Sequence, residues 1–114
     1  MNLHEIITNL HLHVLTDPHD FANIEVESGY TSDLLSCVMT GASSRCVWVT
    51  LIAHNNVVAV AALLDVAAVI ITEHALPDEA TIQKANEQGI ILLSTPHPSF
   101  HVIGQLWEMG LRAN

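Results

Sequence analysis

The stretch TLIAHNNVVAVAALLDVAAVIITEH, from Thr50 to His74, is the most hydrophobic run in the chain and decides its fold. A helix that crosses a membrane needs about 20 consecutive apolar residues. The apolar part of this run is shorter, contains Asp65, and divides into a helical segment, Asn56–Leu64, and a β-branched segment, Ala67–Thr72. We therefore interpret the run as a helix and a strand in the core of a soluble domain, and not as a membrane anchor.

The alternation of strands and helices continues on both sides of this run. The pattern predicts further strands at Cys46–Thr50 and Ile90–Ser94, and further helices at Pro77–Gln88 and Pro98–Met109. Pro77 lies near the start of its helix, and Gly89 and Gly110 follow the last residues of the two helices. Strands that alternate with helices of this length imply right-handed crossovers and a parallel sheet. We predict an α/β fold of three layers, with a mostly parallel sheet and flanking helices, in a single domain over residues 1–114.

The N-terminal third gives weaker signals. We expect strands at Leu10–Leu15 and Asn23–Val26 and a helix at Thr31–Met39, with Thr31 or Ser32 as its cap and Asp33 favouring its positive end. We see no linker and no second domain.

Two of the predicted helices differ in their apolar faces. In Asp78–Gln88 the apolar positions Ile82 and Ala85 lie on one stripe, which is typical of a helix that faces solvent. Val57–Leu64 is apolar all round, so we expect its sheet to cover one side, and the N-terminal region or a second copy of the chain to cover the other.

Composition restricts the partners of the chain. Half of the 114 residues are hydrophobic and only 13% are charged, and this excess of apolar surface predicts a homodimer. The chain has twelve acidic residues and only three basic ones, Arg45, Lys84 and Arg112, so binding to nucleic acid or to an anionic membrane surface is not expected. Cys37 and Cys46 read as isolated buried thiols, and the start of the chain lacks the features of a signal peptide, so we expect a cytoplasmic protein.

Hydroxyl residues end the three central strands at a fixed interval. Thr50, Thr72 and Ser94 are spaced 22 residues apart (72 − 50 and 94 − 72), and a histidine follows each of them: His54, His74 and His97. The carboxyl ends of parallel strands share one edge of the sheet, where the N-termini of the following helices favour anions. We predict a ligand site there, formed by Thr50, His54, Asn55, Asn56, Thr72 and Ser94. The alternative is that these residues only cap helices.

Neither a cofactor nor a catalytic site is predicted. The histidine pairs His11/His13 and His97/His101 could each share a face, but neither pair has an obvious third metal ligand nearby. The sequence contains no GxxxxGK[ST], GxSxG, HExxH or GxGxxG motif, so it does not predict an enzyme. Asp78 and Glu79 occupy the first turn of a predicted helix, where they complement the helix dipole.

Three segments, GYTSDLLSCVM, WVTLIAHNNVVAVAALLDVAAVIIT and TIQKANEQGIILLST, together resemble the DRTGG domain family, over Glu25–Leu111. The resemblance implies a domain similar to the N-terminal domain of HPr kinase/phosphorylase, a regulatory or dimer-forming module and not a catalytic one. It also implies a likeness to small bacterial proteins encoded beside iron-only hydrogenase genes. The sequence departs from the family's name-giving run, because TEHALPDE follows Ile71 without paired glycines.

These observations together predict a non-catalytic, dimeric regulatory module that senses a small anionic ligand such as an adenine nucleotide. Two alternatives stay open: a metal-binding accessory protein for hydrogenase assembly, and a purely structural protein that binds a protein partner.

Overall fold

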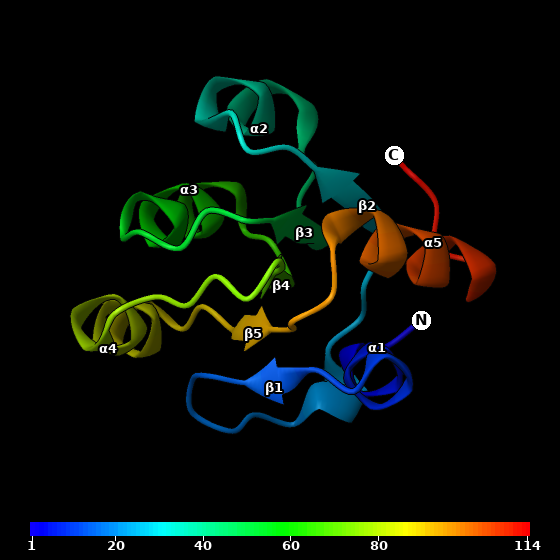
Figure 1. Ribbon diagram of the computed structural model, residues 1–114, viewed down its shortest axis with the longest axis horizontal. Helices are drawn as coiled ribbons and strands as arrows, with labels where there is room; N and C mark the ends of the chain where they lie inside the picture. The colour runs from blue at the N-terminus through cyan, green and yellow to red at the C-terminus, as the bar shows by residue number, and fades with distance from the viewer.

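One five-stranded sheet lies at the centre of the computed structural model, which describes residues 1–114 (Figure 1). The strand order is β1-β5-β4-β3-β2; β1 is antiparallel to β5, and the other neighbours are parallel. The elements, in chain order, are α1 (Leu3–Leu10), β1 (His13–Val14), the 3₁₀ turn η1 (Phe21–Asn23), β2 (Ser28–Thr31), α2 (Leu35–Gly41), β3 (Cys46–Thr50), α3 (Asn56–Leu64), β4 (Ala68–Ile71), α4 (Glu79–Gln88), β5 (Leu92–Ser94) and α5 (Ser99–Glu108).

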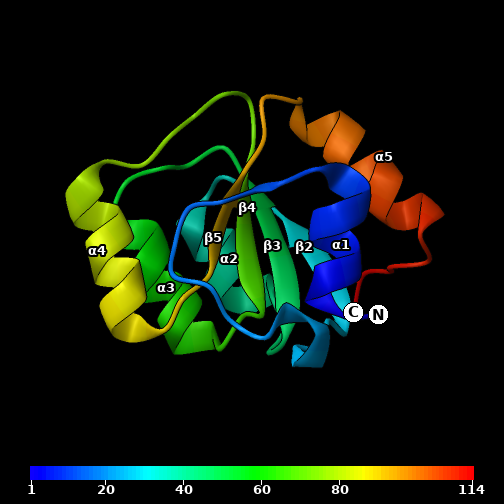
Figure 2. The same ribbon diagram turned by 90° about the horizontal axis from the view of Figure 1, so that it is seen from below.

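The helices form two layers on opposite faces of the sheet. Helices α2, α3 and α4 cover one face, and α1 and α5 cover the other (Figure 2). Strands β2 to β5 are neighbours in chain order, so three right-handed crossovers in the same direction place α2, α3 and α4 together. Neighbouring residues of each strand point to opposite faces: Trp48 belongs to the core under α2–α4, whereas Val47 and Val49 belong to the core under α1 and α5. The predicted three-layer α/β fold is confirmed.

From Cys46 to the end of the chain, the predicted elements agree closely with the structure. The bounds of β3 and α3 are those predicted, and β4, α4, β5 and α5 lie within the predicted ranges. Asp78 is the N-cap of α4 and its side chain accepts a hydrogen bond from the Thr81 N–H. Gly89 ends the same helix in the left-handed conformation, with φ of 70°. The α4 face that contacts the core includes Thr81 and Ala85, both buried, with Ile82 partly buried beside them.

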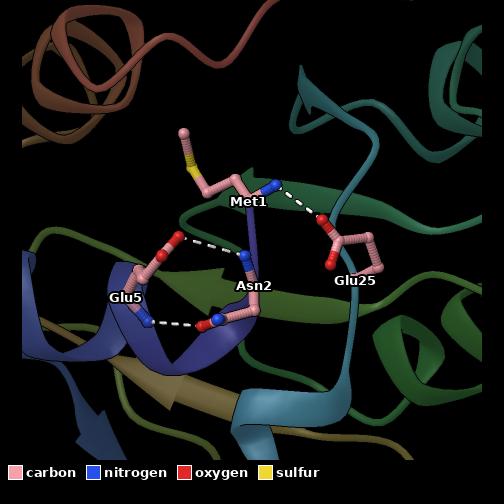
Figure 3. A network of polar contacts seen from close by, with 4 residues as sticks. All are labelled: Met1, Asn2, Glu5 and Glu25. Atoms are coloured by element: carbon pink, nitrogen blue, oxygen red, sulfur yellow. Dashed lines mark hydrogen bonds and ion pairs between the residues drawn. The ribbon is translucent and has the colours of Figure 1, made fainter.

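The first ten residues form a helix that the sequence prediction missed. Helix α1 buries Leu3, Ile6 and Leu10 against the sheet. Asn2 and Glu5 form a capping box at its start: the Asn2 side chain accepts from the Glu5 N–H at 2.9 Å, and the Glu5 carboxylate accepts from the Asn2 N–H at 3.2 Å (Figure 3). The Met1 amino group donates to the Glu25 carboxylate at 2.6 Å, which ties this helix to the segment before β2.

Of the two strands predicted in the N-terminal third, one is confirmed only in part and the other is wrong in position. Leu10–Leu15 forms a strand only at His13–Val14, because Leu10 ends α1 and His11 turns the chain in the left-handed conformation. Asn23–Val26 is not a strand: Asn23 belongs to η1, and the strand begins later, at Ser28.

Helix α2 starts later than the predicted Thr31–Met39, and its predicted caps are wrong. Thr31 belongs to β2, and the N-cap residue, Leu34, makes no side-chain capping bond. Asp33 does not face the helix, because its carboxylate accepts from the Thr50 hydroxyl at 2.8 Å and from the Leu51 N–H at 2.9 Å. The Ser32 carbonyl accepts from the Trp48 indole N–H at 3.0 Å. These tertiary bonds hold residues 32 and 33 against the end of β3, so that α2 begins only at Leu35.

The surroundings of α3 differ partly from the prediction. Its flanks contact α2 and α4, while α1 lies on the other face of the sheet, so the N-terminal helix does not cover it. Ala59 and Leu63 remain exposed on its outer side.

The prediction that both cysteines are buried is partly wrong: Cys37 is exposed, whereas Cys46 is buried and its burial raises the pKa of the thiol. None of the helices has the length and hydrophobicity that a membrane crossing requires.

Candidate ligand site at the carboxyl edge of the sheet

The carboxyl ends of β2 to β5 lie along one edge of the sheet, where the loops that follow β3, β4 and β5 gather (Figure 2). Thr50 and Ser94 are both register partners of Ile71, so Thr72 lies one residue beyond them. Because side chains alternate along a strand, the Thr50 and Ser94 side chains lie on the α2–α4 face, and Thr72 lies on the α5 face. The spacing of 22 residues therefore identified a common edge but not a common face.

Two of the three hydroxyl groups are used within the fold. Thr50, fully buried, donates to Asp33 and accepts from the Ile52 N–H at 3.2 Å. Thr72, also fully buried, bonds to the Ser99 hydroxyl at 2.6 Å, which joins β4 to the start of α5. Neither hydroxyl has a donor or acceptor directed at the surface, so both stabilise the edge rather than offer a contact to a ligand.

Ser94 differs from the other two, because its hydroxyl makes no hydrogen bond within the protein and lies on the wall of a cavity of about 250 Å³. Two histidines also line this cavity: His13, which is the antiparallel register partner of Ser94, and His74. The remaining lining residues are Ala75, Leu76, Thr95 and Pro96. The lining contains no carboxylate, although the protein carries a net charge of −9.

The sequence prediction included only Ser94 among the residues of this cavity. His74 was noted as the histidine that follows Thr72, and His13 only as part of a pair with His11. Thr95 was missed, although it directly follows Ser94 and is buried; its hydroxyl accepts from the His97 N–H at 3.2 Å. No local signal places His13 here, because its position depends on the pairing of β1 with β5.

The other three predicted site residues, His54, Asn55 and Asn56, lie exposed at the start of α3 and outside this cavity. Asn55 occupies the N-cap position but makes no capping bond, and the Asn56 side chain makes no hydrogen bond within the protein. The Asn56 N–H instead donates to His54 Nδ1 at 3.3 Å. The hypothesis that the two asparagines only cap the helix is therefore not supported by their hydrogen bonds.

Carboxylates from the protein occupy two helix N-termini at this edge. Asp78 caps α4, and hydrogen bonds from Thr81 lower the pKa of the Asp78 carboxyl group. The Glu73 carboxylate accepts from the Ser99 N–H at 2.9 Å, in the first turn of α5. Glu73 and His74 are consecutive residues in the left-handed region, with φ of 64° and 63°. This turn follows Thr72 directly, where the DRTGG resemblance leads one to expect paired glycines.

Large apolar side chains are exposed along the same edge. They are Leu34 before α2, Leu51 after β3, Leu76 before α4 and Phe100 in the first turn of α5. Phe100 is 90% exposed. Each of the four parallel strands is therefore followed by one large apolar residue that the domain itself does not cover.

Of the two histidine pairs considered as metal ligands, only His97 and His101 lie together as expected. His11 ends α1 and His13 lies in β1, so the two do not share a strand face. His97 and His101 do lie together, with ring centroids 4.4 Å apart. No group of three or more His, Cys, Asp and Glu side chains is arranged to hold a metal ion.

Comparison with solved structures shows a likeness in fold. No protein-family profile matches the sequence, and no curated protein does. The fold is similar to a crystal structure of the CBS and DRTGG domains of the regulatory region of Clostridium perfringens pyrophosphatase, complexed with its activator, diadenosine tetraphosphate. The TM-score is 0.72 at 17% sequence identity, over 90% of this chain and 44% of the other. This chain thus spans less than half of that one, and the likeness concerns the fold.

Proposed function

We propose that this chain is a non-catalytic regulatory domain of the DRTGG type, which binds a small anionic ligand in the cavity beside Ser94. The observation that carries the proposal is the free Ser94 hydroxyl, which lies in a cavity with two histidines and no carboxylate. Hydroxyl and imidazole N–H groups are donors that suit a phosphate or carboxylate oxygen. In a chain with a net charge of −9, such a lining is unusual and favours an anion over a cation.

The size of the cavity suggests which part of a ligand it accepts. Its volume of about 250 Å³ is below the roughly 300–1,000 Å³ of pockets that enclose a whole drug-sized molecule. A phosphate group fits inside, while the rest of a nucleotide would extend over the exposed edge, where Leu76 and the turn His54–Asn56 lie. Diadenosine tetraphosphate is the activator in the similar solved structure, so adenine nucleotides are the first ligands to test.

Calorimetric titration of AMP, ADP, ATP and inorganic phosphate into the purified protein tests this proposal. Ser94→Ala should weaken binding about tenfold, since a hydrogen bond to a charged group contributes about 1.5–3 kcal/mol. The melting temperature should barely change, because the Ser94 hydroxyl bonds to nothing in the protein. Ser36→Ala, which removes an exposed hydroxyl on α2, is the matched control and should leave both quantities unchanged. A Ser94→Ala variant that binds as tightly as the parent protein would refute the site.

Asn56→Ala tests the wider edge independently. The Asn56 side chain makes no capping bond, so the substitution should cost far less than the ~1 kcal/mol of a lost cap. Weaker nucleotide binding without a loss of stability would show that the start of α3 contacts the ligand. Unchanged binding would restrict the site to the cavity.

We further propose that the domain forms a homodimer through its carboxyl edge. Four exposed apolar residues on this edge, including Phe100 and Leu34, provide the excess apolar surface that the composition predicted. Light scattering should give a dimer mass at micromolar concentration, and Phe100→Glu should shift it towards the monomer. Leu63→Glu, on the exposed side of α3, serves as the control, because Leu63 is a large exposed apolar residue away from this edge. A monomer mass for the parent protein would contradict the proposal.

The proposed role does not include catalysis. The motifs of nucleotide-hydrolysing and phosphoryl-transferring enzymes are missing from the sequence, and Lys84 lies within α4 and follows no glycine-rich loop. We expect no release of phosphate from ATP above the level of a buffer control. Turnover that persists after a second purification would contradict this expectation.

A metal-binding accessory role is the second candidate, because the His97 and His101 rings lie side by side at the start of α5. A zinc titration that binds one equivalent in the parent protein, and none in His101→Ala, would favour this role over the regulatory one.

A further inference from the structure

A second cavity, of about 290 Å³, lies on the opposite face of the sheet, between α5 and the edge strand β2. Gly29, Thr31 and Val49 form its floor, and Ile103 and Trp107 from α5 form one wall. The segment after α5 closes another side, because it returns to β2, where the Gly29 N–H donates to the Arg112 carbonyl at 3.0 Å (Figure 2). Seven of the ten lining residues are hydrophobic.

Gly29 keeps the floor of this cavity open. A Cβ atom at this position would approach Leu111 Cδ2 to 3.2 Å, which is closer than ordinary van der Waals contact. Any larger side chain would fill part of the space between β2 and the returning segment. The cavity therefore depends on the absence of a side chain at position 29, and it is wide enough for an apolar group of moderate size.

Arg112 supplies the only basic side chain on the rim of this cavity. Its guanidinium lies 4.1 Å from the centre of the Trp107 ring, and Nη1 donates to the carbonyls of Trp107 and Leu111 at 2.8 and 3.0 Å. It forms no ion pair, since the one ion pair in the protein joins Met1 and Glu25. Twelve acidic side chains are present, yet none pairs with this arginine. Because a guanidinium has five N–H donors, the other nitrogens are free to bind an incoming carboxylate.

We propose that this cavity binds a small monocarboxylate with an apolar body, such as a medium-chain fatty acid or an arylacetate. The apolar floor and wall would cover the body of the ligand, and the Arg112 guanidinium, held in place by Trp107, would pair with its carboxylate. This site is separate from the cavity beside Ser94 and does not depend on the proposed function. The two cavities share no lining residue.

Tryptophan fluorescence can test the site with octanoate and octanol as probes. Trp107 lies on the cavity wall and is 55% exposed, whereas Trp48 is fully buried in the other core and provides a constant background. Octanoate should change the emission in a saturable way, and Arg112→Gln should raise its dissociation constant about three- to fivefold while leaving that of octanol nearly unchanged, because an ion pair with the exposed Arg112 contributes up to about 1 kcal/mol. Lys84→Gln, which removes a positive charge from α4, is the matched control and should bind octanoate as the parent protein does.

A second variant distinguishes the loss of charge in Arg112→Gln from an indirect change in the shape of the C-terminal segment. Ile103→Phe enlarges a wall residue without changing charge, so it should weaken octanoate and octanol together. Equal affinities for the two probes in the parent protein, or no effect of Arg112→Gln on octanoate, would overturn the proposal. Absence of saturable binding would also overturn it, and so would burial of Trp107 in a dimer, since a second copy would then occupy the cavity.

Discussion

The turn after β4 allows a quantitative test of backbone strain at the carboxyl edge. Glu73 and His74 both adopt the left-handed conformation, which costs a residue with a Cβ atom roughly 1–2 kcal/mol and costs glycine almost nothing. The His74 side chain makes no hydrogen bond, so His74→Gly removes the strain without removing a hydrogen bond. Glycine also gains conformational freedom in the unfolded chain, which opposes this effect by about 0.4–1 kcal/mol. We expect His74→Gly to stabilise the protein by about 0.5–1 kcal/mol.

Glu73→Gly should behave differently at the same kind of position. It relieves similar strain but removes the carboxylate that accepts from the Ser99 N–H, a bond worth about 1 kcal/mol. The two effects nearly cancel, so Glu73→Gly should be neutral or slightly destabilising. The double variant, which introduces paired glycines at this turn, should be close to His74→Gly alone in stability.

Urea unfolding followed by circular dichroism measures these differences, and thermal melts provide a second measure. For a domain of this size, the expected change for His74→Gly corresponds to a rise of about 2–4 °C in melting temperature. His19→Gly is the matched control, because His19 is an exposed loop histidine without a positive φ. It should lose about 0.4–1 kcal/mol. If His74→Gly destabilises the protein as much as His19→Gly does, the strain assigned to this turn is wrong.

Three further predictions concern other contacts. Asp33→Ala should destabilise the protein by about 1–3 kcal/mol in urea unfolding, because the buried Thr50 hydroxyl loses its acceptor. The pKa of Asp78 lies below its ordinary value of 3.8. The stabilising effect of this carboxylate is therefore present above pH 3.8 and is lost as the pH falls through the lower pKa of the folded state. The difference in stability between the parent protein and Asp78→Ala should shrink accordingly in acid. Asn2→Ala should cost about 1 kcal/mol through loss of the capping box and increase hydrogen exchange in α1.

The sequence predicts an element more accurately when residues close in the chain stabilise it than when distant residues do. Helix α3 and strand β3 were located correctly because their apolar patterns are continuous and their neighbours are close in sequence. Helix α1 was missed although Asn2 and Glu5, spaced as in a capping box, and the period of Leu3, Ile6 and Leu10 were readable. In contrast, β1 has only two residues and exists because it pairs with β5, about 80 residues away, which no local pattern reveals.

The sequence located three of the candidate residues at one edge of the sheet but did not predict their individual contacts. The 22-residue interval correctly placed Thr50, Thr72 and Ser94 at the carboxyl ends of the strands. Register then decided which hydroxyl remains free: Asp33 reaches Thr50, and Ser99 reaches Thr72, while nothing in the fold reaches Ser94. Long-range bonds of this kind are set by tertiary structure, so residue types at strand ends cannot distinguish a structural hydroxyl from one that is available to a ligand.

This distribution of contacts also changes the physical basis for binding an anion. The sequence suggested that helix N-termini would supply the positive potential. In the structure, the Asp78 and Glu73 carboxylates already lie at the N-termini of α4 and α5 and neutralise them. Beside these two helices an anion must therefore be held by side-chain donors, which gather without a carboxylate on the wall formed by Ser94, His13 and His74. Selectivity would then depend on the shape of this wall more than on the field of the helices.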